Sequence, residues 1–543
     1  MLARFVRLRA RSIIVVTFAL AASAFFVTAA FGDGDPQPVD FAHNVTNAPA
    51  PVAGAVFGNG PAVKTGSAIC TTPTQPTPNV NTDCETSSAG PGPHNETSIA
   101  INPTDQNNLI GGANDYQLGI NPGGHVSESV LSRAHVTFDG GRTWSMFPIN
   151  ANSAYQATGD PAVAFDDAGH AYYATLGFRF VGPANAQNPD VLVATSSDKG
   201  RTWTEHRIAQ GSGNEGSVGD LLDKEYVTAW GNGNAIVTYG DFRLGHKGSF
   251  ETAVIYASVT HDAGQTWSAP QPISGSDNEA FVSVPTRTSD GRVFVAYMNT
   301  FDNETGRDTY RVVEVSPATG ARIAGPFTVG GVIDGVDDYP FAFGSPTYHD
   351  SIFRSWAAGN ITADPTHPGH LAVVWSDMRN GRATDPDPYA TATNSDVIVS
   401  QSFNYGRDWS TPAAIERAND QWMPWGAYDT TGRLRVGTFD RATDGANHLY
   451  DYSLATETAG STLTFAVAPV TTVKSDPTRD DRWFAATLNP AFPFATSFIG
   501  DYSNIAVFPN GSGVASYWTD LRNPVSFGGR SGHGEDAYFA KTQ

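Results

Sequence analysis

One short motif, present in four copies, constrains the fold of this chain more than any other feature. It runs S/T-x-D-x-G-x-x-W and first reads VTFDGGRTW at residues 136–144. An acid in such a turn accepts hydrogen bonds from N–H groups, the glycine permits a positive φ, and the tryptophan is free to pack. Recurrence along one chain indicates a repeat architecture. The motif residues are Asp139 and Trp144, Asp198 and Trp203, Asp262 and Trp267, and, with asparagine replacing the acid, Asn404 and Trp409.

Each motif copy belongs to a longer unit that begins at about residue 95. Two short apolar strands around a Gly-, Asp- or Pro-containing turn can be read seven times, and a third strand follows and runs into the motif. Charged residues make up only 16% and aromatic residues 11%, a mixture that suits short strands and tight turns. Four-stranded units are typical of β-propeller blades. We therefore expect an all-β, seven-bladed propeller, with six blades as the alternative.

The last unit determines how the ring must close. The chain ends at Gln543 directly after a third strand, so the fourth strand either comes from before residue 95 or is missing. We expect residues 61–69 to supply it, because pairing between the two ends of the chain removes an exposed sheet edge.

The motif matches the Asp box, and residues 95–543 resemble the sialidase superfamily with its bacterial neuraminidase repeats. The resemblance implies a propeller in which the Asp boxes are structural. Asp boxes also occur in other glycoside hydrolases and in propellers without catalytic activity. Fold resemblance alone therefore leaves the activity open.

The N-terminal region predicts export. Arginines precede an apolar run at residues 13–31, and small residues lie near its end, which is the order of a signal peptide. We expect residues 1–31 to be a cleaved signal, with a signal anchor as the alternative. Residues 32–94, rich in Pro, Thr and Gly, form a tether. Its two cysteines, Cys70 and Cys84, are expected to form a disulfide in a secreted or extracytoplasmic protein.

Charge and motif content exclude several classes of function. A net charge of −21 with only 33 Lys and Arg excludes nucleic-acid binding. No motif for an organic cofactor is present, and no spacing of Cys or His predicts a metal site. Calcium at Asp337 and Asp338 is an alternative without EF-hand spacing. We expect a monomer whose partner is an extracellular glycan or glycoprotein, with membrane contact only through an uncleaved anchor.

Two sets of polar residues fall on the propeller face that usually binds ligands. Acidic residues precede the first strands of the units, and arginines with a nearby aspartate follow the second strands. The arginines either pair with aspartates to brace the blades or contact an anionic ligand. The candidate substrate-binding residues are Arg243, Arg379, Arg441, Arg522 and Asp501.

The sequence GDYS at residues 500–503 resembles the context of the sialidase tyrosine nucleophile. The resemblance implies Tyr502 as nucleophile, Glu225 or Asp160 as its base, and Asp115 or Asp160 as general acid. Arg379 and Arg522 would hold the acidic group of the sugar. The alternative is a tyrosine that makes ordinary hydrogen bonds at the channel mouth. The Arg-Ile-Pro motif of hydrolytic sialidases is missing, and Glu96-Thr97-Ser98 stands in its place.

Two functions therefore remain open. One is an exo-sialidase type of glycoside hydrolase acting on extracellular glycans, and the other is a non-catalytic propeller that binds a carbohydrate or a protein. Three arginines converging beside a tyrosine–carboxylate pair would favour the enzyme. Arginines that are each tied to an aspartate of their own blade would favour the binding module.

Overall fold

The computed structural model describes strands and turns with no α-helix among its described residues, which hold a single 3-10 turn at His246–Gly248. In the same part of the chain, no helix is long and apolar enough to cross a membrane. The predicted signal or anchor at residues 1–31 lies outside the described residues. These are 66–84, 92–120, 126–149, 154–179, 187–214, 217–300, 308–334, 338–342, 345–385, 387–459, 462–477, 498–527 and 530–543.

The strands form seven antiparallel sheets, each ordered from a first strand to a fourth. Blade 1 comprises β3 (His94–Ile101), β4 (Leu109–Ile120), β6 (Arg133–Thr137) and β7 (Ser145–Pro148). Blade 2 comprises β8 (Ala157–Phe165), β9 (Ala171–Phe178), β10 (Asp190–Ser196) and β11 (Thr204–Ala209). Blade 3 comprises β12 (Gly219–Trp230), β13 (Asn234–Leu244), β14 (Phe250–Thr260) and β15 (Gln271–Pro272). Blade 1 also carries β1 (Cys70–Thr71) beyond β7 and β5 (Val126–Val130) on β4.

The later blades repeat the same order. Blades 4 to 7 comprise β16 (Ala280–Arg287), β17 (Val293–Asn299), β18 (Asp308–Val315) and β19 (Arg322–Val332); β22 (Asn360–Ala363), β23 (Leu371–Asp377), β24 (Asp396–Ser402) and β25 (Ala413–Ile415); β26 (Gln421–Tyr428), β27 (Leu434–Asp440), β28 (Asp451–Glu457) and β29 (Phe465–Pro469); and β30 (Asn504–Val507), β31 (Val514–Asp520), β34 (Asp536–Thr542) and β2 (Val80–Asn81). Two small hairpins, β20 (Phe341–Ala342) with β21 (Ser345–Pro346) and β32 (Pro524–Phe527) with β33 (Arg530–His533), lie outside the blades.

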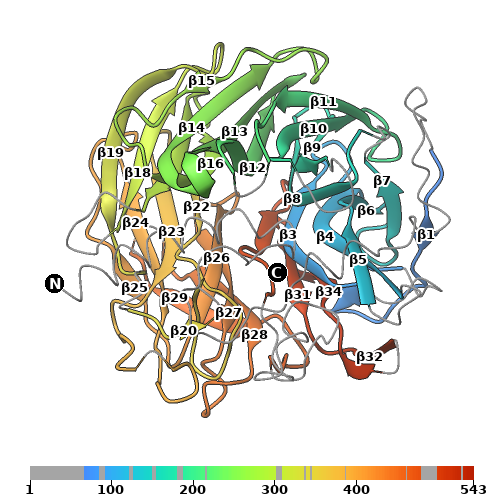
Figure 1. Cartoon of the computed structure of the whole chain (residues 1–543), viewed down its shortest axis with the longest axis vertical. Coiled ribbons are helices and arrows are strands. Elements are labelled where there is room, and N and C mark those ends of the chain that lie inside the picture. The colour runs from blue at the N-terminus through green and yellow to red at the C-terminus, as the bar shows by residue number, and fades with distance from the viewer. Residues whose placement is uncertain are drawn as a thin grey trace.

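The seven sheets surround one axis in chain order (Figure 1). Each first strand contacts the first strand of the next blade, and β30 contacts β3, so the ring is closed. The predicted seven-bladed propeller is therefore confirmed, and the six-bladed alternative is wrong.

The ring closes through the N-terminal segment, although not through the residues we expected. Val80 and Asn81 of β2 pair with Phe539 and Tyr538 of β34 and complete blade 7. The end of the 61–69 segment instead approaches blade 1, where the Ile69 N–H donates to the Met146 carbonyl. A strand of two residues in a Pro- and Thr-rich segment has no alternating pattern to predict it.

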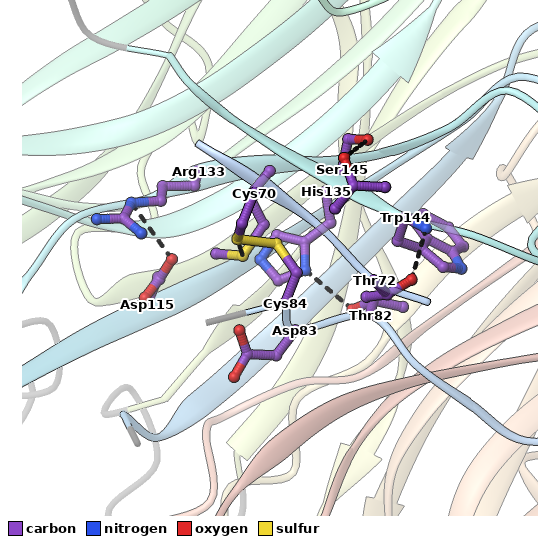
Figure 2. Close-up of a disulfide and its surroundings, with 12 residues drawn as sticks. Cys70, Thr72, Thr82, Asp83, Cys84, Asp115, Arg133, His135, Trp144 and Ser145 are labelled. Carbon is purple, nitrogen blue, oxygen red and sulfur yellow. Dashed lines mark hydrogen bonds and ion pairs between the residues drawn. A yellow bond between two sulfur atoms is a disulfide. The ribbon is translucent and has the colours of Figure 1, made fainter. Parts of the chain in front are cut away.

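The predicted disulfide between Cys70 and Cys84 is present (Figure 2). Cys70 belongs to β1 on blade 1, whereas Cys84 follows β2 on blade 7. The bond therefore holds a segment of the chain that spans the seam between the first and last blades.

The four motif copies form the turns between third and fourth strands. In the first turn, Asp139 accepts hydrogen bonds from the N–H groups of Arg142 and Thr143 at 2.9 and 3.0 Å. Gly141 has φ 95°, and a Cβ there would collide with the Phe539 ring. Trp144 is fully buried and stacks on Tyr517 of blade 7 at 6.2 Å between ring centroids. The turn thus places a large apolar side chain between two blades.

Candidate functional site

The first strands of five blades share a bulge close to their beginnings. The pairing of each with its second strand shifts register there, and the residue in the bulge has a positive φ. Left-handed backbone at a residue other than glycine costs about 1–3 kcal/mol and often marks a functional site. The five residues are Glu96 (54°), Asp160 (57°), Lys224 (52°), Val282 (48°) and Met423 (48°).

Three of these bulge residues meet in a buried group that we call the axial charge cluster: Glu96, Asp160, Lys224, Arg354 and Asp501. The Lys224 Nζ lies 2.6 Å from Asp160 Oδ2, 2.8 Å from Asp501 Oδ2 and 3.0 Å from Glu96 Oε1. The Arg354 guanidinium adds a two-pronged contact to Asp501, with Nε 2.7 Å from Oδ1. All five side chains are buried, and that of Lys224 is 2% exposed.

Two acids of the cluster, Glu96 and Asp501, have pKa values shifted in opposite directions. Burial and the neighbouring Asp160 raise the pKa of Glu96, and Lys224 only partly opposes them. Burial also disfavours the charge on Asp501, but Arg354 and Lys224 hold its pKa well below the usual range. The raised pKa of Glu96 lowers the negative charge that the acids of the cluster place against its two cations.

The two acids beside Lys224 in the sequence also have raised pKa values. Burial, with added repulsion from Asp160, raises the pKa of Glu225, and neither oxygen of this carboxyl has a hydrogen-bond partner among the described residues. Burial raises the pKa of Asp223 to about 8 against the opposing charge of Lys224. A buried carboxyl that keeps its proton near neutral pH can serve as a general acid.

Tyr502 lies next to the axial charge cluster, where its hydroxyl donates a hydrogen bond to the Pro161 carbonyl at 3.0 Å. Its ring contacts Tyr226 at 5.4 Å between centroids, and Lys224 Nζ lies 5.7 Å from the ring centroid. Burial raises the pKa of this phenol further above its ordinary value, and Glu96 adds to the effect. The structure thus brings Tyr502, Asp160, Glu225 and Asp501 to one region, with the phenol protonated and hydrogen-bonded.

The four candidate arginines are each paired with an aspartate of their own blade. Arg379 and Arg522 follow the second strands of blades 5 and 7 and make two-pronged contacts to Asp377 and Asp520. In both blades the pair has the spacing i, i+2.

The other two arginines use partners that the sequence pattern did not indicate. Arg243 pairs with Asp220, which lies directly opposite it in the β12–β13 register. Arg441 is fully buried and reaches Asp420 at 3.4 Å and the hydroxyl of Ser351 at 2.6 Å. Asp440, the neighbour of Arg441 in the sequence, pairs instead with Arg417 at 2.9 Å.

Asp115 lies apart in blade 1, among other residues. Its side chain is fully buried beside His94 and Arg133, each 3.5 Å away. Of the two residues named for calcium, Asp338 pairs with Arg382 at 3.2 Å and Asp337 lies outside the described residues, so calcium stays an untested alternative.

Sequence reasoning missed the cations of the axial charge cluster. Lys224 stands between two acids in DKEYV, where a single lysine is typical of a solvated surface. Arg354 precedes blade 5 in a segment without a strand pattern. Only the bulge that recurs in five of the first strands gives Lys224 the same position as Glu96 and Asp160.

Comparisons with known proteins find similar structures at low identity. No protein-family model matches the chain, and no curated protein does either. A Hadza microbial sialidase aligns with a TM-score of 0.42 and 12% identity over 77% of this chain and 76% of its own. A NanB sialidase mutant of Streptococcus pneumoniae aligns with a TM-score of 0.41 and 8% identity over 88% of this chain and 99% of its own. A Penicillium chrysogenum alpha-L-arabinanase aligns with a TM-score of 0.39 and 15% identity over 67% of this chain and 93% of its own. At this level of similarity, function has to be argued from the residues of the chain itself.

Proposed function

We propose that the protein is an extracytoplasmic, non-catalytic propeller that binds a carbohydrate or glycoprotein on the face where the first strands begin. One observation carries the proposal. All four arginines that could grip an acidic sugar are paired with an aspartate of their own blade. In the axial charge cluster, Glu96, Asp160 and Asp501 each contact Lys224, as expected of a structural ion cluster in the channel.

The state of Tyr502 supports the same conclusion. A covalent tyrosine mechanism needs a base that accepts the phenol proton. The described hydrogen bond of this hydroxyl goes to a backbone carbonyl, which cannot act as a base, and the pKa of the phenol is raised. The disulfide across the ring seam supports an oxidising compartment, where such bonds persist.

The proposal is tested by measuring hydrolysis and binding on the same preparation. Fluorogenic sialosides and neutral glycosides should show no turnover, whereas a glycan array should show saturable binding. Arg243 is the most exposed of the four arginines and is paired with Asp220, so Arg243→Ala should leave glycan binding unchanged. Arg142→Ala is the matched control, because Arg142 is exposed on a motif turn at the opposite face. Turnover that Tyr502→Phe abolishes would contradict the proposal.

A glycoside hydrolase that uses carboxyls instead of tyrosine is the second candidate. It is favoured by the opposite pKa shifts of Glu225 and Asp501, because glycosidic cleavage requires one protonated and one ionised carboxyl. In that case Glu225→Gln would abolish turnover while the circular dichroism spectrum stays unchanged. Tyr502→Phe would keep most of the activity.

A further inference from the structure

Two histidines and one aspartate meet in the interior of blade 1, away from the axial charge cluster. His94, Asp115 and His135 come from the neighbouring strands β3, β4 and β6. Each is at most 1% exposed. One ligand atom from each side chain lies within 4.8 Å of the other two, close enough for all three to approach one small ion.

Most polar atoms of these three side chains make no hydrogen bond in the described part of the chain, although Asp115 has charged neighbours at 3.5 Å. Both ring nitrogens of His94, both carboxylate oxygens of Asp115 and the Nε2 of His135 are buried without a hydrogen bond. A single unsatisfied buried polar group costs about 1–3 kcal/mol, and charged groups cost more. One such atom from each of the three side chains lies close enough to the other two to share a common partner between them.

The outer contacts of His135 are compatible with the tautomer that binds a metal through Nε2. Its Nδ1 lies 2.9 Å from the hydroxyl oxygen of Thr82, and that hydroxyl donates its only proton to the Ala537 carbonyl at 3.0 Å. The Thr82 oxygen can accept a hydrogen bond from Nδ1–H, and the Tyr517 hydroxyl lies 2.8 Å from the same oxygen and 3.2 Å from Nδ1. The Nε2 of His135 then carries a lone pair, and it is the nitrogen without a partner.

The carboxylate is oriented in a comparable way. Arg133 Nε lies 3.5 Å from Asp115 Oδ2, and the other oxygen, Oδ1, faces His94 Nε2 at 3.5 Å. Figure 2 shows Arg133 and Asp115 side by side, with His135 next to Thr82 and close to the disulfide. Groups that fix a ligand from behind in this manner are typical of protein metal sites.

We propose that His94, Asp115 and His135 bind one divalent transition-metal ion, with Zn²⁺ the best match, beneath the segment that closes the ring. Two imidazoles and a carboxylate form a donor set that zinc accepts, with water as a fourth ligand. Zinc binds these atoms at about 2.0–2.2 Å, which side-chain shifts of about 1 Å reach from the present positions.

The bound ion would strengthen the seam of the propeller. The site joins three strands of blade 1, and through Thr82 it also contacts the segment that carries β2 and the disulfide. The alternative for the same residues is an ion pair without metal, in which His94 is protonated. Burial lowers the pKa of His94, but the carboxylates of Asp83 and Asp115 raise it to about 10 overall.

Metal analysis of the full chain, expressed without a histidine tag, distinguishes the two states. The protein is stripped with EDTA, titrated with Zn²⁺ and measured by inductively coupled plasma mass spectrometry after gel filtration. We expect about one zinc per chain, a higher Tm with zinc than with EDTA, and tetrahedral absorption bands with Co²⁺.

Variants assign the ion to these residues. His135→Gln and Asp115→Asn should lower the zinc affinity at least tenfold, whereas His246→Gln, at an exposed histidine on the 3-10 turn, should leave it unchanged. If the variants do not fold, the wild-type stoichiometry and Co²⁺ spectrum still decide. Wild-type protein that keeps no zinc and shows the same Tm in zinc and EDTA would overturn the proposal in favour of the ion pair.

Discussion

Replacing Lys224 by methionine should be among the most destabilising single substitutions in the propeller. The Lys224 ammonium lies within 3.0 Å of three buried carboxyl oxygens. Removing one partner from a buried ion pair costs about 3–5 kcal/mol, because the remaining charge is left unpaired. Such a loss is a large fraction of the 5–15 kcal/mol of a typical domain. The free energy of unfolding of the variant should rise as the pH falls from 7 to 5, because the buried carboxyls that have lost the Lys224 ammonium take up protons.

Lys199→Met is the matched control for this experiment. Lys199 also has a positive φ and pairs with a single carboxylate, Asp105, at 2.7 Å, but its side chain is 44% exposed. Exposed pairs contribute about 0–1 kcal/mol. Both variants are measured by urea unfolding, followed by tryptophan fluorescence and circular dichroism. Equal losses for the two lysines, or a loss below about 1 kcal/mol for Lys224→Met at pH 7, would refute the reasoning.

Three further predictions concern single features of the fold. Folded Asp223 has a pKa of about 8, whereas an unfolded aspartate has a pKa near 3.9, so the stability of the protein falls as the pH rises across this window. The variant Asp223→Asn should flatten this decline and raise the Tm at pH 8. An unchanged dependence of Tm on pH would contradict the prediction. Asp139→Ala removes the hydrogen-bond acceptor of the first motif turn and should lower the free energy of unfolding in urea by about 1–3 kcal/mol. Asn404→Ala should lower it less, because the acceptor in that turn is a neutral amide. Replacing both Cys70 and Cys84 by serine should cost about 3 kcal/mol and speed hydrogen exchange in β34, and unchanged exchange there would argue against closure through β2.

The repetitive part of the fold was predictable because its signals are local. The four motif copies and seven hairpins depend on residues a few positions apart, so strand order, turns and blade count follow from them. The closing strand was not predictable in the same way. Val80 and Asn81 pair with the far end of the chain, and a two-residue strand carries no periodic signal.

The candidate site was likewise predictable only where its residues follow from the repeat. The positions of Glu96, Asp160 and Asp501 at the starts of first strands follow from the repeat, and the structure brings them together. Their ion partners do not follow, because Lys224 and Arg354 have no recognisable motif and are identified only by contacts between blades. His94, Asp115 and His135 are likewise far apart in the sequence and become neighbours only through strand pairing.

Intact-mass spectrometry with a mechanism-based fluorinated sialoside tests the proposed function most directly. Such a compound traps the covalent glycosyl intermediate that a tyrosine nucleophile must form. Tyr502 donates its hydroxyl proton to the Pro161 carbonyl and all four candidate arginines are paired, so a non-catalytic propeller should show no increase in mass after prolonged incubation. A mass increase of one sugar, mapped by peptide sequencing to Tyr502 and lost in Tyr502→Phe, would contradict it.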